Sequence, residues 1–261
     1  MDSPLPGFTA SSFTHEETTR TIFRRGVGPG VVIMTEMPGI TPQVIGFAER
    51  VVTEGFTVVL PQLFGTPGKE ATPGYVVGQI ARACVRREFS VLAARESSPI
   101  TTYLRALCRS VHAELGGKGV GAIGMCFTGN FALALMVDPV VMAPVLSQPS
   151  LPFGLGKERR AGLHLSDADL AVVKQRTAAG VTVLGMRFTH DALCPGERFA
   201  HLREELGAGF EGIEIDSSPG NPHGIKRTAH SVVTSDLVDE AGHPTRIALD
   251  RVLAFFRERL Q

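Results

Sequence analysis

Short apolar runs alternate along the chain with longer segments in which apolar residues recur every three or four positions. The runs are rich in β-branched residues, a pattern typical of strands that are buried on both faces of a parallel sheet. We expect strands at residues 30–37, 56–63, 119–125, 140–147, 181–188 and 209–216.

The segments between these runs have helical spacing. Residues 41–55 begin with Thr-Pro and end with Gly, which are helix start and stop signals. We expect further helices at 99–117, 127–136, 195–207 and 245–260, the last strongly amphipathic. Strands that alternate with helices in this way predict βαβ units, and hence a doubly wound, mostly parallel α/β sheet with helices on both faces. Ligands in such folds bind at the carboxyl ends of the strands.

One stretch interrupts this alternation. Residues 151–166 are typical of a loop and residues 167–180 of a helix, and the two lie between successive predicted strands. We interpret 151–179 as an insertion, forming a lid or a wall of the pocket, within a single domain that spans residues 1–261.

The composition restricts the possible partners and location. The 26 basic and 26 acidic residues cancel, so we expect neither nucleic acid nor an anionic membrane as the main partner. No apolar run has the roughly 18 residues that a membrane span needs. The N-terminus shows no signal peptide, and four scattered cysteines fit reduced thiols. We therefore expect a cytoplasmic protein.

One of these cysteines, Cys126, stands at a predicted strand-to-helix turn, in the stretch "GMCFTG" at 124–129. A nucleophile on such a turn needs a sharply bent backbone with small neighbours. The following helix N-terminus would favour the thiolate and offer amides to a developing oxyanion. However, the last glycine, Gly129, comes one place later than in the usual G-x-S-x-G elbow. The motif alone therefore leaves the packing of a buried thiol as an equal alternative.

A thiol nucleophile needs a base, and the base needs a group that orients it. Asp191 follows the predicted strand 181–188, where a hydrolase with the order nucleophile, acid, histidine carries its acid. Its alternative role is that of a helix cap or loop carboxylate. His223 and His230 both lie on the connection before the last helix, and counting alone leaves both as candidate bases.

A carboxylate also needs an explanation. Glu36 ends the first strongly apolar strand, where a charge is costly unless it is paired or solvated. In a parallel sheet it would face the same cleft as Cys126, and plain solvent exposure is the alternative.

Together these residues resemble the dienelactone hydrolase family, cysteine-nucleophile members of the α/β-hydrolase fold. The resemblance extends from about residue 30 to the C-terminus. It rests on the strand ending in Glu36, on the elbow at 124–126, on "HDALCPGERF" around Asp191 and on "HSVVT" at 230–234. It implies an α/β-hydrolase fold, a Cys126–His230–Asp191 triad and a glutamate, Glu36, that pairs with the resting thiol.

The resemblance also distinguishes between the two histidines. The family's histidine is followed by a small residue, and His230-Ser231 fits this better than His223-Gly224 does. Thr234 departs from the family, because dienelactone-specific members carry an arginine there that holds the substrate carboxylate. The resemblance thus supports the fold and the mechanism more strongly than it supports dienelactone as the substrate.

The expected function is hydrolysis of a small-molecule carboxylic ester or lactone through a thioester, without a cofactor or metal. The amides of Phe127 and Met37 are expected to form the oxyanion hole. Position alone suggests four residues that line the pocket: Phe64, Phe127, Phe153 and Arg82. The alternatives are hydrolysis of organophosphate esters at the same site and a non-catalytic binding or redox-sensing role.

Overall fold

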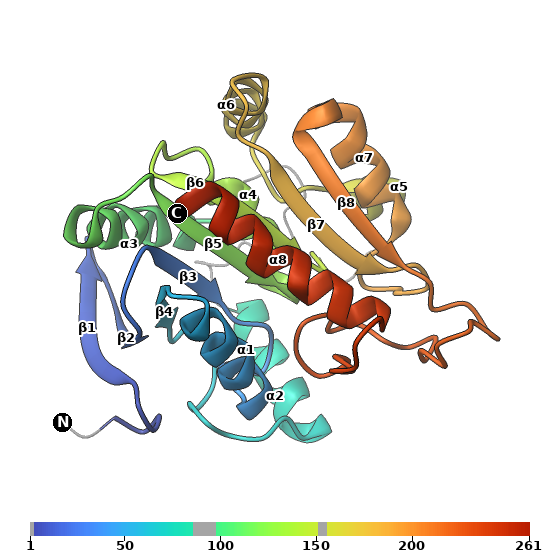
Figure 1. The fold of residues 1–261 in the computed structure, drawn as a ribbon, viewed down its shortest axis with the longest axis horizontal. Helices are drawn as coiled ribbons and strands as arrows, with labels where there is room; N and C mark the ends of the chain where they lie inside the picture. The colour runs from blue at the N-terminus through green and yellow to red at the C-terminus, as the bar shows by residue number, and fades with distance from the viewer. Residues whose placement is uncertain (1–2, 86–97, 151–155) are drawn as a thin grey trace.

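A single sheet runs through the molecule and fixes the position of the other elements (Figure 1). The computed structural model describes residues 3–85, 98–150 and 156–261. Within these residues, eight strands form the sheet in the order β1-β2-β4-β3-β5-β6-β7-β8. The strands are β1 Thr9–His15, β2 Thr18–Arg25, β3 Gly30–Met34, β4 Thr57–Pro61, β5 Val120–Met125, β6 Val141–Ser147, β7 Val183–Phe188 and β8 Phe210–Ile215.

The strands from β3 to β8 are parallel to their neighbours in the sheet, except where β4 meets β2. They are the strands that the apolar runs predict, so the doubly wound, mostly parallel sheet is confirmed. Their carboxyl ends lie at one edge, which brings the residues that follow β3, β5, β6 and β7 close together.

The antiparallel hairpin of β1 and β2 was not predicted. It pairs Thr9 with Arg24 and His15 with Thr18 and adds two strands beside β4. Both strands are rich in Thr, Ser and Arg, because they form a partly exposed edge of the sheet. An edge strand of this kind has no continuous apolar run that would reveal it.

Helices cover both faces of the sheet. Their bounds are α1 Pro42–Thr53, α2 Pro73–Val85, α3 Ile100–Leu115, α4 Gly129–Leu135, α5 Lys157–Ala161, α6 Asp167–Ala178, α7 Gly196–Leu206 and α8 Pro244–Leu260. Side chains alternate in β3 between the two layers of core. Val31 and Ile33 pack with α1 and α8, whereas Val32 and Met34 pack with α3 and α4. Figure 1 shows α1 and α8 in front of the sheet and α3 behind it.

Two helices lie where the sequence did not predict them. The first is α2, Pro73–Val85, because no helix was expected between the predicted strand 56–63 and the predicted helix 99–117. The loop predicted at 151–166 contains the short helix α5 at Lys157–Ala161, where good helix formers lie between Gly156 and Gly162. The start of the predicted insertion, 151–155, lies outside the described residues. The insertion and the single domain stay predictions.

A buried arginine connects α5, α7 and the carboxyl edge of the sheet. Arg198 is fully buried, and its guanidinium donates to the carbonyls of Gly162, Pro149 and Arg159 at 2.8, 2.6 and 2.9 Å. It also donates to Leu193 O at 3.4 Å, just beyond Asp191. Backbone carbonyls therefore solvate this buried charge, and the arginine holds the loops around the site.

Replacing Arg198 by methionine is expected to lower the free energy of unfolding by about 2–4 kcal/mol, because several buried carbonyls lose their donor. Urea unfolding followed by circular dichroism measures this. The control is Arg203→Met on the same helix, which removes an exposed ion pair with Glu214 and should cost about 1 kcal/mol or less. Equal losses in the two variants would contradict a special role for Arg198.

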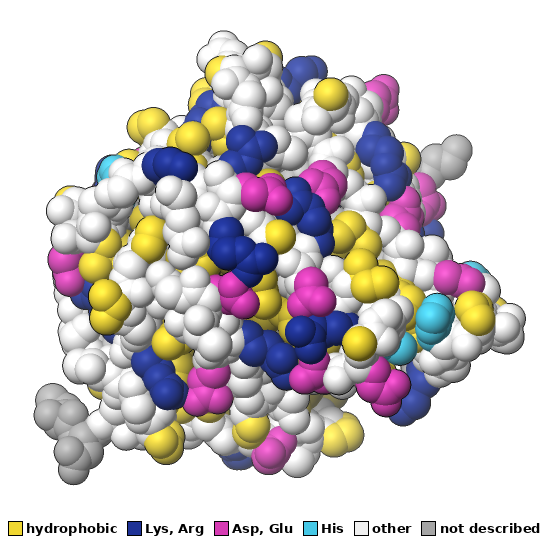
Figure 2. All heavy atoms as spheres, in the orientation of Figure 1, with side chains coloured by type: hydrophobic (Ala, Val, Ile, Leu, Met, Phe, Trp, Pro, Cys, Tyr) yellow, Lys and Arg dark blue, Asp and Glu magenta, His cyan; other side chains and the backbone are white. Residues whose placement is uncertain are grey.

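The outer face of α8 carries both signs of charge. Figure 2 shows Lys and Arg side chains interleaved with Asp and Glu on this face. Arg251 pairs with Glu211 of β8 at 2.6 Å, and Arg246 with Asp239 at 2.6 Å. Exposed pairs of this kind contribute little, so α8 is held mainly by its buried apolar side. Among the described helices, none is long and apolar enough to cross a membrane.

Candidate active site

Cys126 occupies a sharp turn between β5 and α4. Its φ of +54° lies in the left-handed region, which is strained for a residue with a side chain. The turn needs Gly124, because a Cβ there would lie 2.0 Å from the carbonyl oxygen of Thr128. It needs Gly129 as well, because a Cβ there would lie 2.5 Å from the Cα of Pro149. The backbone thus has the form of a nucleophile elbow, with its second close approach one residue later than usual.

His230 and Asp191 meet at the carboxyl edge of the sheet. The Nδ1 atom of His230 lies 2.7 Å from Oδ2 of Asp191, and the carboxylate is buried. The other oxygen, Oδ1, accepts the backbone N–H of Leu193 at 2.9 Å. Both carboxylate oxygens are therefore held, which fixes the orientation of the imidazole ring.

The other ring nitrogen of His230, Nε2, makes no hydrogen bond of ordinary geometry with a described residue. Burial by itself would lower the pKa of His230. The negative charge of the Cys126 thiolate and then the hydrogen bond to Asp191 outweigh burial and hold this pKa well above its usual value of 6.5. The ring is thus oriented by the acid Asp191 and is close enough to Cys126 to respond to its charge.

The second candidate histidine lies elsewhere. The ring of His223 is exposed and packs edge-on against His243, with 5.5 Å between the centroids. The acid Asp191 therefore meets His230, the histidine that the resemblance favours.

Glu36 is buried at the end of β3, with 5% of its surface exposed, so the alternative of plain solvent exposure is wrong. Its Oε2 accepts the hydroxyl of Ser231 at 2.6 Å and the side-chain amide of Gln148 at 3.1 Å. Its Oε1 accepts the hydroxyl of Thr234. These three donors hold the carboxylate, and the pairing with the Cys126 thiol stays a prediction.

Two residues of this region escaped sequence reasoning. Gln148 follows β6 with a φ of +34° and donates to Glu36 while its Oε1 accepts Val232 N at 3.4 Å. Asp236 accepts the backbone N–H groups of His230 and Ser231 at 2.8 and 2.9 Å. Both fix the loop that carries His230. The only sequence signal for Gln148 was a polar residue at the end of an apolar strand.

The residues predicted to form the oxyanion hole flank this site. Phe127 lies in the 3-10 helix Cys126–Thr128 that follows the elbow, and Met37 follows Glu36 on the loop after β3. Of the pocket residues suggested by position, Phe64 packs against Phe127 at 6.2 Å between ring centroids. Arg82 is exposed on α2, and Phe153 lies outside the described residues.

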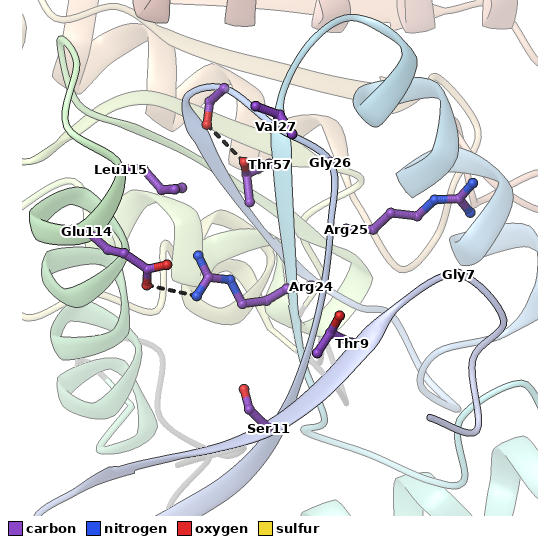
Figure 3. Close-up of a pocket in the computed structure, with 11 residues that line it drawn as sticks. Gly7, Thr9, Ser11, Arg24, Arg25, Gly26, Val27, Thr57, Glu114 and Leu115 are labelled. Carbon is purple, nitrogen blue, oxygen red and sulfur yellow. Dashed lines mark hydrogen bonds and ion pairs between the residues drawn. The ribbon is translucent and has the colours of Figure 1, made fainter. Parts of the chain in front are cut away.

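A separate hollow of about 540 Å³ lies at the opposite, amino edge of the parallel strands (Figure 3). Gly28 and Thr57 there stand before β3 and at the start of β4. Several of its polar groups are already paired, since Arg24 binds Glu114 at 2.8 Å and Thr57 donates to Gly28 O at 2.9 Å. The candidate catalytic residues lie instead at the carboxyl edge.

The model of the Dienelactone hydrolase family matches residues 20–260. The chain belongs to this family. It is 29% identical over 139 residues to the Saccharomyces cerevisiae protein named "Putative carboxymethylenebutenolidase", and this match spans about half of each protein, 49% of this chain and 48% of the yeast protein.

Solved structures share the fold of this family member. A dienelactone hydrolase-like promiscuous phosphotriesterase from metagenomic libraries has a TM-score of 0.64 at 17% identity, with 98% of this chain and 100% of the other covered. The α/β-hydrolase GrgF from Penicillium has a TM-score of 0.64 at 14% identity, with 98% and 99% covered. The dienelactone hydrolase of Anabaena variabilis has a TM-score of 0.62 at 14% identity, with 97% and 98% covered. The α/β-hydrolase fold is therefore confirmed.

Proposed function

We propose that this family member hydrolyses small carboxylic esters or lactones through a Cys126–His230–Asp191 triad and a thioester intermediate. The observation that carries the proposal is the environment of the His230 ring. Its Nδ1 is bonded to a buried carboxylate, and the charge of Cys126 helps to hold its pKa above the usual value. This is the arrangement that activates a thiol nucleophile.

The proposed reaction has two halves. The thiolate attacks the carbonyl carbon, and the amides of Phe127 and Met37 hold the oxyanion. The intermediate collapses to a thioester, and protonated His230 gives its proton to the leaving alkoxide. Neutral His230 then takes a proton from water, hydroxide adds to the thioester, and the acid leaves as the thiolate is restored. A lactone follows the same steps, with its own hydroxyl as the leaving group.

A substrate panel tests the proposal. We expect turnover of p-nitrophenyl acetate and of simple lactones, measured as kcat/KM and compared with the phosphotriester paraoxon. Higher kcat/KM for paraoxon than for every ester would favour the alternative that the phosphotriesterase neighbour suggests. No turnover of any of them would contradict catalysis and favour a binding or redox-sensing role.

Replacing Asp191 by asparagine is expected to shift the alkaline limb of the pH profile to lower pH. The raised pKa of His230 keeps its proton to higher pH than a free imidazole would. Activity that needs this proton is present below the raised pKa and is lost as pH rises through it. Asparagine removes the charge and the charged hydrogen bond, so the pKa of His230 falls.

The measurement is kcat/KM against pH for an ethyl ester, whose alkoxide must be protonated as it leaves. The control is Asp216→Asn, whose carboxyl is exposed and should leave the profile unchanged. An alkaline limb at the same pH in Asp191→Asn and wild type would be inconsistent with the proposed role of Asp191.

The balanced charge and free thiols are consistent with a small-molecule hydrolase. The cytoplasmic location stays a prediction.

A further inference from the structure

The elbow carries a threonine, Thr128, where the usual nucleophile motif has its last glycine. Gly129 provides the close approach that this turn needs, since its Cα faces the backbone of Pro149. Position 128 can therefore carry a side chain, and the side chain of Thr128 is fully buried. Its hydroxyl has a set of partners that packing alone does not explain.

The hydroxyl of Thr128 joins the ends of two central strands. The register of β3 and β5 ends with the pair Met34 and Gly124. One residue further, the N–H of Met125 donates to Thr128 Oγ1 at 2.9 Å, and this hydroxyl donates to Met34 O at 2.8 Å. The hydroxyl thus relays a hydrogen bond between the strands at the point where their own pairing stops.

Each of the joined strands leads into one half of the proposed oxyanion hole. Beyond Met34, the chain continues through Thr35 and Glu36 to Met37, and beyond Met125 the elbow continues to Phe127. The carbonyl of Thr35 also lies 3.3 Å from Thr128 Oγ1, so the contact extends along this loop. An oxyanion hole works only if its two amides are held at a fixed separation, because they must already point at the charge that develops.

We propose that Thr128 is a positioning residue whose hydroxyl sets the separation of the Met37 and Phe127 amides. This inference rests on the proposed function, because it assumes that these amides hold an oxyanion. Thr128 does not touch the reacting atoms; it acts through the ends of β3 and β5. A hydroxyl suits this place because it can accept one hydrogen bond and donate another.

The test compares Thr128→Val with Thr128→Ser. Valine keeps the shape but cannot relay the hydrogen bond, whereas serine keeps the hydroxyl. We expect Thr128→Val to lower kcat for p-nitrophenyl acetate about 10-fold or more with KM within about twofold, since the loss is confined to the transition state. Thr128→Ser should stay within about threefold of wild type.

Two probes of Cys126 separate this role from general disruption of the elbow. An aryl trifluoromethyl ketone adds to the thiolate and forms an oxyanion, so its inhibition constant should rise in Thr128→Val in parallel with the loss of kcat. Alkylation by iodoacetamide needs the thiolate but no oxyanion hole, so its rate should be unchanged. If Thr128→Val does not fold, Thr128→Ala removes the same hydroxyl and takes its place.

Three results would overturn the inference. Full activity of Thr128→Val would leave the proposed function intact and remove the role of the hydroxyl. Equal losses of kcat, of ketone binding and of alkylation would mean that Thr128 merely supports the fold of the elbow. Absence of turnover in wild type would overturn the proposed function, and this inference with it.

Discussion

Replacing Cys126 by alanine is expected to lower kcat/KM for p-nitrophenyl acetate by about 10⁴-fold or more, since removal of a covalent nucleophile disables the whole triad. Alanine removes the atom that forms the thioester while it keeps the φ of the elbow close to that of cysteine. The assay is release of p-nitrophenol at saturating and subsaturating substrate concentrations.

A second cysteine provides the control. Cys108 lies in α3, fully buried, and burial raises the pKa of its thiol. It is therefore an unreactive thiol, and Cys108→Ala should keep activity within about threefold of wild type. If Cys126→Ala retained wild-type activity, or if both variants lost activity equally, Cys126 would not be the nucleophile.

Replacing His230 by alanine is expected to lower kcat about 10³-fold or more, because the thiol loses its base and the leaving alkoxide loses its proton donor. Alkylation of Cys126 by iodoacetamide at neutral pH should also slow, because the thiolate is the form that reacts and the base that removes the thiol proton is gone. Steady-state kinetics and the alkylation rate measure the two effects.

His223 is the matched control, since it lies on the same connection before α8. Its ring packs on His243 rather than on Asp191, so His223→Ala should keep kcat within about twofold of wild type. The reverse result, with activity lost only in His223→Ala, would mean that His223 is the base and His230 is not.

Sequence reasoning predicted the parallel part of the sheet because strands buried on both faces leave continuous apolar runs. It also predicted which residues gather at the carboxyl edge. Cys126 and Asp191 directly follow strands, and the strand order brings these ends together. The choice of His230 came from a resemblance, and its contact with Asp191 comes from the structure.

What the sequence could not predict depends on contacts between distant residues. The polar edge strands β1 and β2 form because they pair with each other and with β4. The partners of Glu36 come from the loops around 148 and 231–234, whose side-chain directions follow from local backbone angles such as the positive φ of Gln148. The role of Thr128 depends on where the ladder between β3 and β5 stops.

The partners of Glu36 also affect which substrates the site suits. Thr234, which stands where dienelactone-specific relatives carry an arginine, donates its hydroxyl to Glu36. It cannot supply the positive charge that would hold a substrate carboxylate. This agrees with the proposal of a small ester or lactone as the substrate, since such a substrate needs no charge of this kind.

The identity of the nucleophile is tested most directly by intact-mass spectrometry of the acid-quenched enzyme during turnover of p-nitrophenyl acetate, followed by peptide mapping. We expect one acetyl group per chain, located on Cys126, to accumulate early and to persist in Asp191→Asn, where deacylation is slowed. An acetyl group on another residue, or continued turnover without any acetylated enzyme, would contradict a thioester mechanism at Cys126.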